Sequence, residues 1–249
     1  MAGHSKWAQI KHKKAATDAK RGKQFTKLAR AITVAAREGG GDPDGNATLA
    51  TAVQKAKDYS MPKDNIQRAI DRGTGAGASG EAIERAVYEG YGPGGAAIMI
   101  EALTDNRNRT GAEVRHAFDK NGGSLGEPGS VAWIFEKRGV VLVDADRYSE
   151  DDLIPAIDAG AEDVSEDGDL RKVVCPAGRL AAVREALERA GVEIESAELT
   201  MEPRSIVEVG GGEASRLVRL IEALDEHDDV DAVHANFDIP ADVLEQAAA

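Results

Sequence analysis

Lysine and arginine side chains crowd the first 37 residues of the sequence, and side chains of this kind bind anions. Ten cations stand there against one anion, Asp18, which gives the segment a net charge of +9. The cations are Lys6, Lys11, Lys13, Lys14, Lys20, Arg21, Lys23, Lys27, Arg30 and Arg37. Exposed helices normally mix both signs, so this segregation favours a face that binds nucleic-acid phosphates over a merely solvated lysine-rich surface.

The rest of the chain has the opposite charge. It holds 21 of the 31 Lys and Arg but 43 of the 44 Asp and Glu, a balance of −22, and the whole chain carries −13. Electric fields are screened within about 8 Å at physiological salt, so the basic segment can still bind a polyanion locally. The acidic remainder would limit nonspecific coating of nucleic acid.

A second arginine-rich segment is TDNRNRTGAEVRH, which covers residues 104–116. It places Arg107 and Arg109 around the start of a predicted helix that Thr110 or Asn108 would cap. Helix N-termini attract phosphate because their first backbone N–H groups lack partners. The segment therefore predicts either a second phosphate contact or an ordinary capped turn with surface arginines.

The segment YEGYGPGG, residues 88–95, combines two tyrosines with glycines that let a partner approach the backbone closely. The same residues are compatible with a tight turn that leads into a strand. We carry both interpretations forward.

Motifs for catalysis, cofactors and metals fail on context. Two matches to G-x-G-x-x-G lack the strand before and the helix after that a dinucleotide site needs. The loop GDPDGN lacks the glycine and the final glutamate of a calcium loop. The histidines show no metal-binding spacing such as H-E-x-x-H, and Cys175 is predicted to be a small buried hydrophobe. The sequence therefore predicts a non-enzyme without cofactor, metal or small-molecule substrate.

Composition favours a cytoplasmic protein that does not contact a membrane. No apolar run approaches the ~20 residues that a membrane-spanning helix needs. The basic N-terminus is not followed by the apolar stretch of a signal peptide. A single cysteine excludes an internal disulfide and agrees with a reducing compartment.

A helix over 22–38 would position part of the basic segment. Leu28 and Ile32 recur at the spacing of one helix face, whereas Lys23 and Lys27 fall on the opposite face. Apolar packing on one side therefore leaves a row of cations on the other.

Further helices are predicted around this one. One covers 46–59, and another follows Ser60 as its cap with Pro62 in its first turn. Residues 5–20 are predicted to be helical as well. The glycine-rich stretch 72–81 is predicted to be a linker that ends an all-helical domain.

Strands and helices alternate beyond the linker. Predicted strands cover 96–104, 130–135, 139–144, 163–164, 171–175, 192–203, 205–209 and 232–239, and predicted helices cover 110–122, 151–161, 177–191 and 213–227. Residues 139–203 thus give the βαββαβ order of a ferredoxin-like unit. The βαβ segments on either side are incomplete alone and would leave bare sheet edges, which suggests that the middle unit is inserted.

The predicted fold class is therefore multi-domain, α and α+β. We expect a basic, all-helical domain over 1–78 and a discontinuous α+β domain over 79–135 and 204–249. A ferredoxin-like α+β domain over 136–203 would be inserted in the discontinuous one.

The chain resembles the YebC/PmpR family, which includes the translational activator of mitochondrial cytochrome c oxidase. The resemblance rests on segments that occur in family order over nearly the whole length. They are MAGHSKWAQIKHKKAATDAKRGKQFTKLAR, AAREGGGDPDGN, MPKDNIQRAI, RGTG, YEGYGPGG, LTDNRNRT, EVRHAFDKNGG, GSVAWIF and HANFDI.

This resemblance implies the same three domains, no cofactor and no catalysis. It implies either a transcriptional regulator that binds promoter DNA or a translation factor that acts at the ribosome and relieves stalling. Departures from the family pattern are Ala8, His234, and Thr48 and Ala50 where relatives often have arginines. The last two shift the expected phosphate contacts toward the first two helices, and the start MAGHSKW points to a bacterial cytoplasmic member.

The expected function is that of a nucleic-acid-binding regulator of gene expression, with DNA-binding transcriptional regulation first. The alternatives are a ribosome-associated, RNA-binding translation factor, a protein-interaction adaptor and, more weakly, an enzyme that uses an interdomain cleft. The expected partners are DNA or ribosomal RNA. The expected contacts are Lys6, Lys11, Lys13, Lys14, Lys20, Arg21, Lys23, Lys27, Arg30, Arg107 and Arg109.

Overall fold

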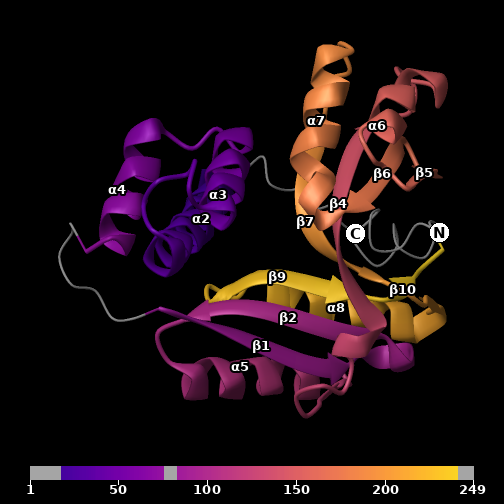
Figure 1. Ribbon diagram of the computed structural model, residues 1–249. Helices are drawn as coiled ribbons and strands as arrows, with labels where there is room; N and C mark the ends of the chain where they lie inside the picture. Colours follow the sequence, from indigo (N-terminus) through magenta and orange to yellow (C-terminus); the bar gives the residue numbers. More distant parts are fainter. Residues whose placement is uncertain (1–17, 76–82, 241–249) are drawn as a thin grey trace.

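The computed structural model describes residues 18–75 and 83–240 of the chain. Three helices form one group, and two α+β units stand beside it (Figure 1). We call residues 18–75 the helical domain and residues 83–240 the body. Helices followed by an α+β region with antiparallel sheets agree with the predicted fold class.

The helical domain consists of α2 (Asp18–Gly39), α3 (Ala47–Asp58) and α4 (Lys63–Gly73). Their apolar stripes meet in one core around Leu28, Ile32 and Leu49, as the helical spacing predicts. The helix predicted over 22–38 is therefore confirmed, although it begins earlier, at Asp18. The helix predicted over 5–20 lies mostly outside the described residues.

The first sheet of the body has the strand order β3-β1-β2-β9, and all its pairs are antiparallel. Its strands are β3 (Ser124–Leu125), β1 (Glu84–Tyr91), β2 (Ala97–Thr104) and β9 (Val230–Ala235). Two helices, α5 (Arg107–Lys120) and α8 (Gly211–Asp225), cover one face of this sheet (Figure 1). The opposite face is turned toward the helical domain.

Alternation along β2 explains how this sheet has two buried faces. Ile98 and Ile100 pack in the core with α5 and α8, whereas Ala97 and Met99 join a second cluster on the other face. Beyond the sheet, β8 (Val207–Glu208) and β10 (Phe237–Asp238) form a short parallel pair.

The second sheet has the order β5-β6-β4-β7 and is again antiparallel throughout. Its strands are β5 (Asp163–Asp167), β6 (Leu170–Pro176), β4 (Phe135–Asp144) and β7 (Ser196–Pro203), and its helices are α6 (Ile154–Asp158) and α7 (Leu180–Arg189). Cys175 lies fully buried in this core, as predicted.

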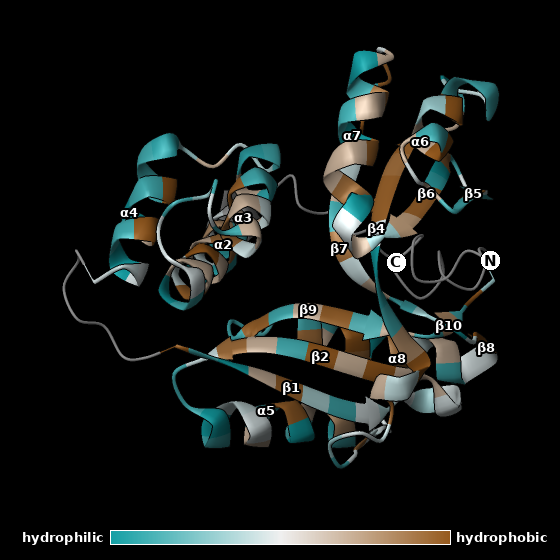
Figure 2. Ribbon diagram, viewed as in Figure 1, coloured by the Kyte–Doolittle hydropathy of each residue, from teal (hydrophilic) through white to brown (hydrophobic). Residues whose placement is uncertain are grey.

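Apolar residues concentrate along the central strands, and the outward turns of α4 are hydrophilic (Figure 2). The buried apolar clusters of the described residues each lie wholly within the helical domain or wholly within the body. Among the described residues, no buried apolar cluster therefore spans the two parts.

The start of α4 differs from the prediction. Pro62 is the N-cap of α4 and makes no side-chain capping bond, so it is not in the first turn. Ser60 stands two residues earlier with a φ of 58°, in the left-handed region, and does not cap the helix. The prediction was wrong because serine is common both at helix N-caps and in turns, and Ser60 belongs to the turn that precedes α4.

Three predictions in the body were also wrong. Residues 132–134 form a 3₁₀ turn, and β4 begins only at Phe135. Helix α5 is capped by Asn106, whose side chain accepts the N–H of Arg109, and not by Thr110 or Asn108. Strand β1 includes Tyr88 and Tyr91, which were expected in a loop because the glycines interrupt the β pattern. The end of the same segment does form a tight turn, Pro93–Gly95, that leads into β2, as the other interpretation predicted.

Candidate nucleic-acid interface

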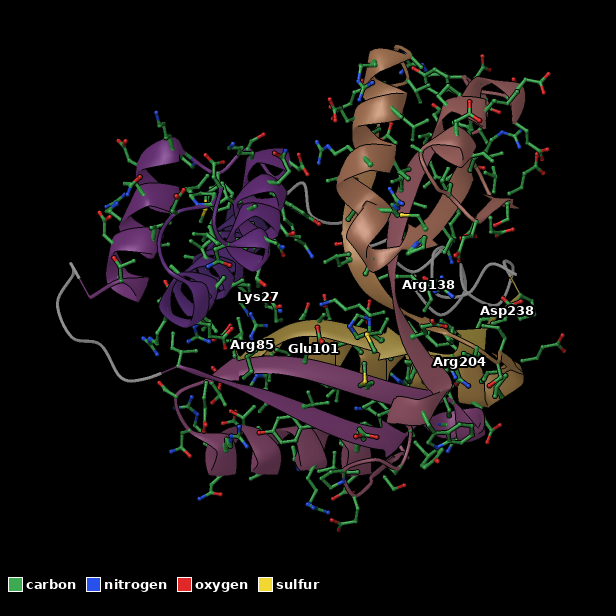
Figure 3. The ribbon with its side chains drawn as sticks, viewed as in Figure 1. Lys27, Arg85, Glu101, Arg138, Arg204 and Asp238 are labelled. Carbon is green, nitrogen blue, oxygen red and sulfur yellow. The ribbon has the colours of Figure 1, made fainter. Side chains whose placement is uncertain are left out.

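One face of α2 carries the cations that the sequence singled out, and it is directed at the body. Packing of Leu28 and Ile32 into the helical core fixes the rotation of α2. This rotation leaves Lys27 and Arg30 on the side that faces the sheet, and Figure 3 shows Lys27 between α2 and the strands. Their nearest partners belong to residues 225–229, which we call the acidic turn: Asp225, Glu226, His227, Asp228 and Asp229.

Asp229 is the centre of this contact. Its carboxylate accepts Arg30 Nη1 at 2.7 Å on Oδ1 and Arg109 Nη2 at 2.9 Å on Oδ2. The hydroxyl of Thr110 donates to Oδ2 at 2.7 Å, and Asp229 is only 4% exposed. Burial alone would raise the pKa of Asp229, but the hydrogen bonds from Arg109, Thr110 and Arg30 outweigh it and lower the pKa to about 2.

The other cations of this face bind weaker anionic groups. Lys27 Nζ donates to the carbonyl oxygen of Asp225, which is the last residue of α8. Carbonyls at a helix C-terminus carry partial negative charge, so a lysine is favoured there. Arg30 also donates to the carbonyl oxygen of Asp228 at 2.9 Å, and Lys23 Nζ lies 3.9 Å from the Asp228 carboxylate.

The helical domain also contacts the second sheet through charges. Lys55 of α3 pairs with Glu198 of β7 at 2.7 Å, and the Glu198 carboxylate raises the pKa of Lys55. Arg184 of α7 pairs with Asp58 of α3 at 2.9 Å. Ion pairs thus connect the helical domain to both sheets of the body.

The arginines predicted at the start of α5 are engaged within the body. Arg107 pairs with Glu84 at 2.9 Å and donates to the carbonyl oxygen of Arg85 at 2.7 Å. Arg109 pairs with Asp105 at 2.7 Å as well as with Asp229. The Asn106 cap and these bonds mean that the polar groups in the first turn of α5 bind other groups of the protein. This is the ordinary capped turn that was one of the two predictions for the segment.

Four of the predicted contacts, Lys6, Lys11, Lys13 and Lys14, lie outside the described residues. Lys20 and Arg21 belong to the beginning of α2. For all of them the nucleic-acid contact stays a prediction.

An exposed aromatic pair lies on another part of the body. The indole N–H of Trp133 and the hydroxyl of Tyr91 both donate to the carbonyl oxygen of Ser130, at 3.1 Å and 2.9 Å. Trp133 is 68% exposed. The buried carboxylate of Glu89 fixes this loop by accepting the backbone N–H groups of Gly129, Val131 and Ala132.

Burial would raise the pKa of Glu89, but those three backbone bonds prevail and lower it. The loop that presents Trp133 is therefore organised around a carboxylate that stays ionised at neutral pH. A large aromatic ring held in place and left exposed is suited to stacking on a flat partner such as a nucleobase.

Asp229, Glu89 and Trp133 were not predicted from the sequence as functional residues. Asp229 belongs to an acidic run that has the composition of a solvated surface, and its partners are far away in the sequence. Trp133 was assigned to a strand, where alternation would have allowed burial. The sequence offered only a weak indication of the role of Glu89, namely its position next to glycines that form a turn.

Within residues 18–75 and 83–240, no group of three or more His, Cys, Asp or Glu residues is arranged to hold a metal ion. No helix within 18–75 or 83–240 is both long enough and apolar enough to cross a membrane.

Comparisons with known proteins cover nearly the entire chain. Residues 5–76 match the model of the TACO1/YebC protein N-terminal domain, and residues 83–237 match the model of the TACO1/YebC second and third domain. A "probable transcriptional regulatory protein" of Rubrobacter xylanophilus is 57% identical over 249 residues, which is 100% of both chains. One of the same description from Desulfotalea psychrophila is 53% identical over 250 residues, again 100% of both.

A crystal structure of a conserved hypothetical protein from Aquifex aeolicus has the same fold. It superimposes with a TM-score of 0.85 at 48% sequence identity, over 96% of this chain and 98% of that one. Both family models, the full-length relatives and this structure agree with one another, and the chain belongs to the TACO1/YebC family.

Proposed function

We propose that this protein is a nucleic-acid-binding regulator of gene expression, with duplex DNA as its first target. The observation that carries the proposal is the charge segregation, +9 over residues 1–37 against −22 over the rest. The description of the relatives as probable transcriptional regulatory proteins supports it. The proposal includes the absence of catalysis, cofactor and small-molecule substrate.

Phosphate contacts are assigned to the basic N-terminal segment. Lys6, Lys11, Lys13 and Lys14 supply its first part, and Lys20 and Arg21 continue it into α2. Contacts of this kind fix position on the backbone and carry no base information. Stacking by Trp133 and Tyr91 would add a contact on the body to any unpaired base.

The domain division is part of the same proposal. The second sheet comes from the continuous stretch 135–203, and the strands of the first sheet lie before and after it. This order supports a ferredoxin-like domain inserted in a discontinuous α+β domain. Such an arrangement would let the two α+β units present separate surfaces to one partner.

Charge reversal tests the proposal. We expect Lys13→Glu with Lys14→Glu to weaken binding of a 20-base-pair duplex by about tenfold or more, measured by fluorescence anisotropy, because two phosphate contacts become repulsive. The matched control is Lys63→Glu with Lys120→Glu, which makes the same change of net charge at exposed positions on α4 and α5. Equal weakening by both variants would mean that location does not matter, and the proposal would fail.

Ribosome association is the second candidate, since backbone contact does not distinguish promoter DNA from structured RNA. Sucrose gradients of lysate with and without RNase separate the two. Co-migration with ribosomes that RNase abolishes favours a translation factor, and retention on one promoter fragment against competitor DNA favours a transcriptional regulator. Binding that survives nuclease treatment would favour a protein-interaction adaptor.

A further inference from the structure

The contact between the helical domain and the body contains several ion pairs. Arg30–Asp229, Lys55–Glu198 and Arg184–Asp58 are ion pairs across it. Among the described residues, no buried apolar cluster crosses from one part to the other. Interdomain contacts that lack a large apolar core permit domain motion, and ion pairs weaken as salt rises.

The acidic turn presents carboxylate and carbonyl oxygens to a row of cations on α2, and a phosphate backbone would likewise present oxygens that carry negative charge. Lys23, Lys27 and Arg30 lie three and four residues apart on one face of α2, so they form a row. Each one meets oxygens of the acidic turn: the Asp228 carboxylate, the Asp225 carbonyl, and the Asp229 carboxylate with the Asp228 carbonyl. A polyanion that occupied this row would have to displace the acidic turn.

We propose that the acidic turn is a built-in competitor for these three cations, and that a nucleic-acid backbone releases the helical domain from the body by replacing it. This inference rests on the proposed function and adds its regulation. The closed protein binds only through the cations that precede Lys23, which are Lys6, Lys11, Lys13, Lys14, Lys20 and Arg21. The open protein adds Lys23, Lys27 and Arg30, so it binds more tightly and with a steeper salt dependence.

The free-energy balance makes this exchange feasible. A ligand shifts a conformational equilibrium only by the difference between its affinities for the two states, and three more phosphate contacts supply such a difference. The contacts to be broken are unequal. Lys23 and Asp228 are largely exposed and 3.9 Å apart, so they hold weakly, whereas Arg30 and Asp229 form a short, shielded bond. Asp229 therefore holds the stronger of the two ion pairs that the acidic turn makes with α2.

Distances between spin labels measure the opening. Labels on Gln67→Cys of α4 and Asp119→Cys of α5 report on the helical domain and the body, because both positions are exposed and the native Cys175 is buried. We expect one short distance population in 0.05 M salt and a longer, broader one after addition of a 20-base-pair duplex or of ribosomal RNA. Anisotropy on the same samples records binding.

Variants of the acidic turn test the competition. Asp229→Asn removes the negative charge that holds Arg30, so we expect it to tighten duplex binding by about threefold or more and to populate the longer distance without ligand. The control is Asp105→Asn, which removes the other carboxylate bound to Arg109; among the described residues, Asp105 forms no hydrogen bond or ion pair with the helical domain. Because Asp229 also binds Thr110 within the body, Asp228→Asn serves as a milder variant with a smaller gain in the same direction.

The outcomes separate the two proposals. Binding with an unchanged distance, or unchanged affinity in both Asp229→Asn and Asp228→Asn, overturns the competition and leaves the proposed function standing. Absence of binding to duplex and RNA alike overturns both. Binding that lengthens the distance, together with tighter binding by the two variants but not by Asp105→Asn, supports the competition.

Discussion

At the scale of single residues, Asp229 joins two arginines that are 79 positions apart in the chain, Arg30 and Arg109. One comes from the helical domain and the other from the body. A buried carboxylate that lost either partner would retain the cost of burial without its compensation. The pKa of Asp229 therefore reports directly on whether the helical domain is docked.

We expect the Asp229 carboxyl to titrate near its lowered pKa of about 2, followed by carboxyl carbon shifts in NMR spectra. Replacement of Arg30 by glutamine removes one of the hydrogen bonds to the carboxylate and should raise the pKa toward the ordinary value of about 3.9. The control is Arg72→Gln on α4, an exposed arginine of the same domain, which should leave the Asp229 pKa unchanged. If the pKa of Asp229 were the same in the Arg30→Gln variant, the two side chains would not be in contact in solution.

The lowered pKa of Asp229 also determines how the stability of the protein depends on pH. Because the folded pKa lies below the unfolded one, the contribution is present above about pH 4 and is lost as pH falls toward 2. Its size is about 2 kcal/mol for a shift of this extent. The advantage of the unaltered protein over Asp229→Asn in urea unfolding should therefore shrink between pH 5 and pH 2. An advantage that stays constant over this range would contradict the assignment.

At the scale of elements, α2 and α4 cross so closely that Gly73 has no room for a side chain. A Cβ atom there would lie 2.4 Å from the Thr33 carbonyl oxygen and 2.7 Å from Ala36 Cβ. The close crossing holds α4 against Thr33 and Ala36 of α2. It thereby helps to set which face of α2 is presented to the acidic turn.

Alanine at Gly73 should destabilise the helical domain by about 1–3 kcal/mol, because overpacking against backbone exceeds the gain in helix propensity. The matched control is Gly22→Ala in α2, where nothing lies within 4 Å of the new Cβ. That substitution should stabilise the protein by up to about 1 kcal/mol. Thermal unfolding followed by circular dichroism distinguishes the two, and equal effects would contradict the close crossing.

The helices were predictable from the sequence because their apolar residues recur with one period over several turns, as in Leu28 and Ile32 of α2. Short elements were less predictable. The stretch around Trp133 alternates like a strand, yet Glu89 draws its backbone into a turn through three hydrogen bonds. Strand β1 was missed because Gly90 and Gly92 are typical of a loop. Gly90 lies in the strand because a side chain there would collide with Phe118, and Gly92, just after the strand, has no room for a side chain beside Leu217.

At the scale of the whole molecule, ion pairs connect the helical domain to the body. The sequence predicted the row of cations on α2 but not its partners, because the acidic turn lies about 200 residues away and no periodic pattern relates the two. The composition gives the number of charged residues, but only the folded structure shows which of them are in contact. The row therefore has an internal partner that charge counting alone could not have found.

We expect the coupling energy of each ion pair between the helical domain and the body to increase with its burial. In double-mutant cycles, we expect the coupling of Arg30 with Asp229 to be about 1.5–3 kcal/mol, because the bond is charged and shielded from water. The coupling of Lys55 with Glu198 should stay below about 1 kcal/mol, because both side chains are more than a third exposed. Unfolding in urea measures both cycles, and the reverse ranking would contradict the arrangement of the helical domain on the body.

The salt dependence of duplex binding tests the central claim, that a basic N-terminal surface binds a phosphate backbone. If six lysines or arginines engage phosphates, the logarithm of the association constant should fall with the logarithm of salt concentration with a slope of about −5. The double charge reversal at Lys13 and Lys14 should make this slope about 2 units shallower. A slope near zero in the unaltered protein would contradict the account.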